Sequence, residues 1–92
     1  MEIKELSNKI FKNAIEKGLC RDIPETVAWL HSEVSEIYEA FKKKIKAGEP
    51  GWIGQEIADV VILALSLSEQ LRIDIGKEIA DKMEINLSRD QY

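Results

Sequence analysis

Apolar residues recur at spacings of three and four along most of this chain, which is the period of an amphipathic helix. In the first segment, Ile3, Leu6, Ile10 and Ala14 follow this period, with charged and amide side chains between them. The pattern predicts four helices, which run from Ile3 to near Gly18, from Pro24 to about Ala47, from Ile53 or Gly54 to near Leu71, and from Ile75 to about Ser88. We therefore expect an all-α fold.

Capping and breaking residues mark the ends of these helices. Gly18 is a C-terminal stop for the first helix. Asp22 and Asp74 are N-caps in front of the second and fourth helices, and Pro24 suits a first helical turn because its fixed φ matches that of a helix. The clearest breaker is Gly48-Glu49-Pro50-Gly51, which indicates a turn between the second and third helices.

The third helix is apolar nearly all round, unlike the other three. Every residue from Val60 to Leu65 is apolar, and such a helix is expected to be contacted on several sides. Three amphipathic neighbours in a chain of 92 residues offer too little surface to cover it. We therefore expect a homodimer in which helices of both chains share one core, and a compact monomeric bundle is the alternative.

Composition and charge narrow the class of protein. The 92 residues allow one domain, spanning residues 1–92, and the contents of 45% hydrophobic and 33% charged residues are typical of a globular chain. A net charge of −4 argues against a nucleic-acid binder, which needs a basic surface. Cys20 is the single cysteine, so the sequence contains no pair for an internal disulfide, as is usual in a reducing compartment. The start Met1–Glu5 does not resemble a signal peptide. The apolar run Ile57–Leu67 is too short for a membrane span. We expect a cytoplasmic protein with neither a membrane nor a nucleic-acid partner.

Two pairs of acidic residues at helical spacing carry the candidate chemistry. Glu33 and Glu36 lie three residues apart on the second helix, so they share a face. Glu56 and Asp59 do the same on the third helix. Asp59 lies among apolar residues with no Lys or Arg one turn away, and a buried carboxylate has to be paired, protonated or metal-bound. Hard cations such as Mg²⁺ prefer oxygen ligands, so the pattern favours a magnesium site, with a solvated charged face as the alternative.

An antiparallel hairpin would bring the two acidic pairs level. The point midway between them falls just before the Gly48–Gly51 breaker. The chain then has to return about 15 Å, because ten helical residues rise by about that distance. Eight extended residues span about 26 Å, so the geometry is allowed provided that residues 49–53 run back along the second helix.

The order and spacing of these motifs resemble a known family. Glu33-x-x-Glu36 is followed, after 19 residues, by Glu56-x-x-Asp59. This arrangement is similar to the ExxE…ExxD signature of the MazG-like all-α nucleoside triphosphate pyrophosphohydrolases. The surrounding residues also resemble the second and third helices of that family. The likeness covers roughly residues 25–92.

The fourth helix adds a third block to the resemblance. Lys82, Asn86 and Arg89 occur in the order of the family's lysine, asparagine and arginine. Two features depart from the family pattern. Ser32 stands where many members have a second acid, and the sequence reaches Tyr92 without the His-Gly-containing tail that members often have.

The resemblance implies a four-helix MazG-like bundle completed by dimerisation, as a dimer or a dimer of dimers. It implies hydrolysis of a nucleoside triphosphate to the monophosphate and pyrophosphate, in nucleotide-pool housecleaning, with Mg²⁺ as cofactor and Mn²⁺ as a substitute. The metal-ligating and catalytic residues that it carries over are Glu33, Glu36, Glu56 and Asp59. The substrate contacts that it carries over are Lys82, Asn86 and Arg89, for which a polar helix face is the plain alternative.

Two tryptophans and two other functions complete the set of hypotheses. Trp52 either stacks on a base or covers the core. Trp29, one turn before Glu33, belongs to the core or the dimer interface, or borders the base pocket.

The main rival function is a non-catalytic helical dimer that senses a nucleotide or binds a protein. A pyrophosphohydrolase of a histidine-biosynthesis intermediate ranks lower, because the motifs resemble the MazG-like blocks better.

Overall fold

The computed structural model describes residues 2–19, 21–44 and 50–89, without the side chains of residues 43, 44 and 50–52. This part of the chain forms four α-helices and no strand. They are α1 (Ile3–Glu16), α2 (Ile23–Lys44), α3 (Pro50–Gln70) and α4 (Ile75–Leu87). The predicted all-α fold with four helices is therefore confirmed. None of these helices combines the length and the apolar character needed to cross a membrane.

The predicted caps hold the helix ends. The Asp22 carboxylate accepts a hydrogen bond from the backbone N–H of Glu25 at 2.8 Å, at the start of α2. Asp74 accepts in the same way from the N–H of Lys77 at 3.3 Å, at the start of α4. Gly18 has a φ of +67°, the left-handed conformation that favours glycine after a helix.

The start of α3 differs from the prediction. The helix begins at Pro50, not at Ile53 or Gly54, so the stretch expected to run back along the second helix is itself helical from Pro50 onward. The physical reason is that proline needs no N–H partner at the first helical position, and its φ is already helical there. Ala47 and Glu49 lie outside the described residues.

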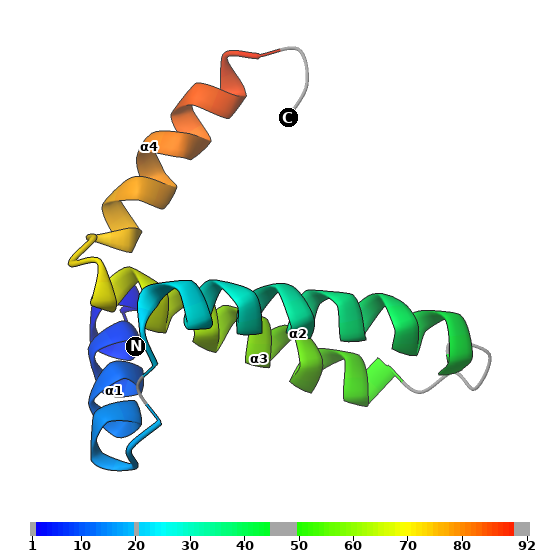
Figure 1. Ribbon diagram of the computed structural model, residues 1–92. Helices are drawn as coiled ribbons and strands as arrows, with labels where there is room; N and C mark the ends of the chain where they lie inside the picture. The colour runs from blue at the N-terminus through cyan, green and yellow to red at the C-terminus, as the bar shows by residue number, and fades with distance from the viewer. Residues whose placement is uncertain (1, 20, 45–49, 90–92) are drawn as a thin grey trace.

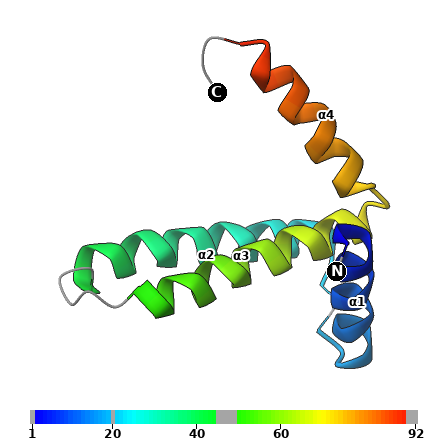
Figure 2. The same ribbon diagram turned by 180° about the vertical axis from the view of Figure 1, so that it is seen from behind.

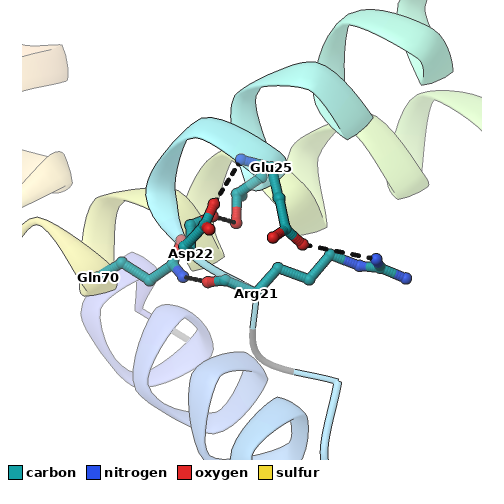
Figure 3. A network of polar contacts seen from close by, with 5 residues as sticks. Arg21, Asp22, Glu25 and Gln70 are labelled. Carbon is teal, nitrogen blue, oxygen red and sulfur yellow. Dashed lines mark hydrogen bonds and ion pairs between the residues drawn. The ribbon is translucent and has the colours of Figure 1, made fainter.

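The centre of the fold is an antiparallel hairpin of α2 and α3, which lie side by side over most of their length (Figure 1, Figure 2). A polar network joins α2 and α3 where α2 begins and α3 ends (Figure 3). The Gln70 side-chain amide donates to the carbonyl oxygen of Arg21, next to the Asp22 cap. Arg21 also forms an exposed ion pair with Glu25 at 4.0 Å. The bond between Gln70 and Arg21 thus ties the end of α3 to the residues just before α2.

Helix α1 packs across the same end of the hairpin, against α3 (Figure 1). Ser7 on α1 is fully buried, and its hydroxyl donates to a carboxylate oxygen of Glu69 on α3 at 2.7 Å. The buried apolar core is small, and among the described residues only Leu63 and Leu65 of α3 are buried hydrophobic side chains. Besides this polar bond, α1 contributes half-buried apolar side chains, such as Leu6 and Ile10.

Helix α4 stands away from the hairpin (Figure 1, Figure 2). It touches α1 near its first turn, where a side chain on Gly76 would meet Ile3 at 3.3 Å. The radius of gyration is 15.3 Å, against about 12 Å for a compact chain of this length. A single chain thus has the four predicted helices but does not pack them into one bundle.

Replacing Ser7 with alanine tests the contact between α1 and α3. The variant leaves the part-buried Glu69 carboxylate without this donor, so we expect Ser7→Ala to lower the free energy of unfolding by about 1–2 kcal/mol. Thermal unfolding followed by circular dichroism measures the loss. The control is Ser88→Ala, which removes an exposed serine hydroxyl bound only to the carbonyl oxygen of Ile85. Equal stabilities of the two variants would contradict this account.

Candidate metal centre

The hairpin brings the two acidic pairs to the same level. At 1.5 Å per residue, Glu33 lies about 16 Å before the end of α2. Glu56 and Asp59 lie about 9 and 14 Å after the start of α3. Because the helices are antiparallel and adjacent, the acidic side chains meet near the middle of the hairpin.

Oxygen atoms of Glu33, Glu56 and Asp59 lie within 4.8 Å of one another. Glu36 lies close enough to the other three for their charges to act on its carboxyl. We call these four residues the carboxylate cluster. Glu33 and Glu56 are half-buried, whereas Glu36 and Asp59 are exposed, so the expectation that Asp59 lies on a largely buried helix is wrong for a single chain. The reason is that α1 and α2 leave part of α3 uncovered.

Like charges in the cluster raise the pKa of the Glu36 carboxyl above its ordinary value. The largest cause is the charge of Glu33, followed by loss of solvating water and by the charges of Glu56 and Asp59. No lysine or arginine among the described residues forms an ion pair with the cluster. The cluster therefore destabilises the fold unless something positive neutralises it.

The donor set fits a hard divalent cation. Mg²⁺ binds oxygen at 2.0–2.1 Å, so ligands on opposite sides of the ion lie about 4.2 Å apart. The separations of up to 4.8 Å between the three carboxylates need only small side-chain adjustments to reach that value. All the donors are carboxylate oxygen atoms. Soft metal ions prefer sulfur ligands, so this cluster favours a hard metal ion.

Trp29 holds one of these carboxylates in place. Its indole N–H donates to a carboxylate oxygen of Glu33 at 3.1 Å, one turn along α2. The guanidinium of Arg21 lies over the indole ring, 4.7 Å from its centroid. The i,i+4 spacing in the sequence already placed Trp29 and Glu33 on one helix face, but only the structure shows that they are bonded.

A cavity of about 260 Å³ lies beside Trp29, between α1, α2 and α3. Trp29 lines it and also contacts the cluster through Glu33, so the cavity and the cluster are neighbours. Its apolar lining residues include Ile10, Leu19, Trp29, Ile62 and Leu63, and its polar ones are Asn13, Lys17 and Ser66. The cavity therefore offers an apolar ring face with a few hydrogen-bonding groups around it.

The residues expected to contact substrate are not brought to the cluster within one chain. Lys82 and Asn86 lie on α4 and Arg89 lies just after it, and α4 points away from the hairpin (Figure 1). The side chain of Trp52 lies outside the described residues. The hairpin thus unites the four carboxylates and leaves the α4 residues apart from them.

Replacing Glu36 with glutamine tests the electrostatic repulsion within the carboxylate cluster. Because the pKa of Glu36 is raised by folding, its charged form destabilises the fold, fully above the folded pKa and less as the pH falls through it. We therefore expect Glu36→Gln to raise the Tm at neutral pH in EDTA, with a gain that shrinks on acidification. Thermal unfolding at several pH values measures it.

Glu84→Gln is the control for this comparison, since Glu84 is an exposed acid on α4, away from the cluster. A gain in Tm that is equal in both variants, or independent of pH, would show that repulsion within the cluster is not its cause.

No protein-family model, curated protein or solved structure matches this chain. The likeness to MazG-like pyrophosphohydrolases therefore rests on the three sequence blocks. The geometry of the hairpin is an independent observation, because it concerns where the four carboxylates lie. Together they make the carboxylate cluster the candidate functional site.

Proposed function

We propose that this protein is a Mg²⁺-dependent pyrophosphohydrolase of nucleoside triphosphates, acting on the nucleotide pool. The observation that carries the proposal is the convergence of four carboxylates, two from α2 and two from α3, with no cation among the described residues to neutralise them. The resemblance to the MazG-like family supplies the reaction. Mn²⁺ is expected to substitute for Mg²⁺.

The residues of the cluster have distinct parts in this proposal. Glu33, Glu56 and Asp59 hold the metal, and the bound metal supplies a water of lowered pKa and shields the triphosphate charge. The bond from Trp29 keeps the Glu33 carboxylate oriented. Glu36 joins the metal ligands, and the negative charge of Glu33 beside it raises the pKa of its carboxyl.

The neighbouring cavity is suited to the base of the nucleotide. It begins about one helical turn from the cluster, since Trp29 precedes Glu33 by four residues and Ile62 follows Asp59 by three. Aromatic faces stack on nucleobases, and amide and hydroxyl groups such as those of Asn13 and Ser66 bond their edges. In this arrangement the phosphates lie on the cluster and the base lies in the cavity.

The functional unit in this proposal is at least a dimer. A chain of 10.5 kDa exposes 7229 Å², whereas a compact monomer of that mass exposes about 5,400 Å². The excess is larger than the roughly 800 Å² that each partner buries in a standard interface. Exposed apolar side chains on α3, such as Ile57 and Val61, are available for this contact.

Pyrophosphate release tests the proposed reaction. With Mg²⁺ present, we expect turnover of at least one member of a panel of ordinary and modified ribo- and deoxyribonucleoside triphosphates. Glu36→Gln and Asp59→Asn should abolish turnover while the circular dichroism spectrum stays helical, and Glu84→Gln should retain it. Folded protein that binds nucleotide without turnover would favour a sensor, and protein that binds none would favour an interaction module.

Thermal stability tests the metal separately from catalysis. A ligand that binds only the folded state at 100 times its dissociation constant stabilises it by about 2.7 kcal/mol. We expect Mg²⁺ to raise the Tm of the parent protein, EDTA to reverse the rise, and Asp59→Asn to remove most of it. A Tm that does not respond to Mg²⁺ or Mn²⁺ would rule out the metal centre.

A further inference from the structure

The cavity beside Trp29 lies on the same side of the hairpin as the exposed acids of the carboxylate cluster. On α2, Trp29 precedes Glu36 by seven residues, and on α3, Ser66 follows Asp59 by seven. Seven residues make about two helical turns, so each pair shares a helix face. Trp29 and Ser66 both line the cavity. The cavity therefore continues the cluster along the hairpin, toward the end that α1 crosses (Figure 1).

Helix α1 supplies two polar side chains to the lining of this cavity, those of Asn13 and Lys17. The backbone N–H of Lys17 donates to the carbonyl oxygen of Asn13 at 3.1 Å, so the helical turn continues to Lys17 and the two side chains share a face. Neither side chain forms an ion pair or a hydrogen bond within the part of the chain that the structure describes. Both are therefore available to a ligand in the cavity.

Asn13 and Lys17 differ in the hydrogen bonds that they can make. The ammonium group of a lysine only donates, whereas the amide of an asparagine donates or accepts according to its orientation. An acceptor opposite Lys17 gains a charge-assisted hydrogen bond, and a donor in the same place leaves both groups without a partner. Lys17 thus selects a ligand with an acceptor at that position, and Asn13 adapts to the neighbouring group.

Nucleobases differ in this respect at the edge opposite the sugar. That edge faces α1 when the phosphates lie on the cluster and the ring stacks on Trp29. Guanine, hypoxanthine, uracil and thymine present a carbonyl oxygen there, next to a ring N–H. Adenine and cytosine present an amino group in the same place, next to a ring nitrogen that accepts. The carbonyl oxygen accepts from Lys17 while the ring N–H donates to the amide oxygen of Asn13, and an amino group cannot replace that oxygen.

We propose that the site prefers nucleotides whose base carries a carbonyl group on the edge opposite the sugar, and that Lys17 makes this selection. Nucleotides of guanine, hypoxanthine, uracil and thymine are then favoured over those of adenine and cytosine. The inference rests on the proposed function, because that function places the phosphates on the cluster and the base in the cavity. Lys17 acts here as a specificity-determining residue.

Calorimetric titration tests the preference without turnover. The probes are dUTP, dCTP, dGTP and dATP analogues with a non-hydrolysable link between the α- and β-phosphates, titrated with Mg²⁺ present. Within each pair of equal ring size, dUTP with dCTP and dGTP with dATP, we expect the first to bind at least about tenfold more tightly. One charge-assisted hydrogen bond accounts for that ratio.

Variants assign the preference to Lys17. Lys17→Met should remove it by weakening only the dUTP and dGTP analogues, and Lys17→Arg, which keeps a side chain that only donates, should retain it. The control is Lys12→Met, because Lys12 is an exposed lysine of α1 that does not line the cavity. It should change none of the four affinities, and circular dichroism checks that each variant stays helical.

Other outcomes would overturn the proposal. Equal affinities within both pairs would show that the cavity does not read this edge, and an equal loss for all four analogues in Lys17→Met would place Lys17 on the phosphates. Turnover of triphosphates without the preference would remove this inference and leave the proposed function standing. The preference without pyrophosphate release would do the reverse. Folded protein that binds none of the analogues would remove both.

Discussion

The close packing of α2 against α3 is the interaction on which the rest of this structure depends. It brings four carboxylates to one point, where they repel one another and raise the pKa of Glu36. The hairpin therefore has to be held together elsewhere. At one end of the hairpin, the Gln70 amide donates to the carbonyl oxygen of Arg21 and joins its two arms. Helix α1 packs on α3 at the same end, through Ser7 and Glu69. Repulsion between the carboxylates in the middle of the hairpin lowers the stability of the fold, and the contacts at its end raise it. Such a trade-off is common at functional sites.

The bond from Trp29 to Glu33 links the carboxylate cluster to the rest of the fold. A glutamate side chain has several rotatable bonds, and fixing one of its oxygen atoms reduces the entropy lost when a ligand binds. The same indole lines the cavity between α1, α2 and α3. The indole therefore lies between the cavity and the carboxylate cluster.

The small core explains why the chain exposes so much surface. Only Leu63 and Leu65 are buried hydrophobic residues among those described, and helix α4 adds little contact to the body of the fold. A chain of this size buries a modest share of its surface even when compact. The apolar side chains left exposed on α3 and α4 include Ile57, Val61 and Met83.

The sequence by itself determined the local structure, because hydrophobic period and caps act within a few residues. Four helices, the caps at Asp22 and Asp74 and the stop at Gly18 follow from it. It placed the start of α3 too late, since Pro50 reads equally as a breaker and as a first helical residue. The sequence also placed the two acids of each pair on one helix face and the two pairs level with each other, which is how they lie in the hairpin.

Only the tertiary structure decided which side chains meet and which are exposed. The spacing could not tell that Asp59 is exposed, that Trp29 bonds Glu33, or that α4 turns away from the hairpin. These facts depend on how much of α3 its neighbours cover and on the direction in which α4 leaves α3, and both are set by contacts between residues far apart in the chain. A helical period fixes the face of a residue, whereas packing fixes what that face touches.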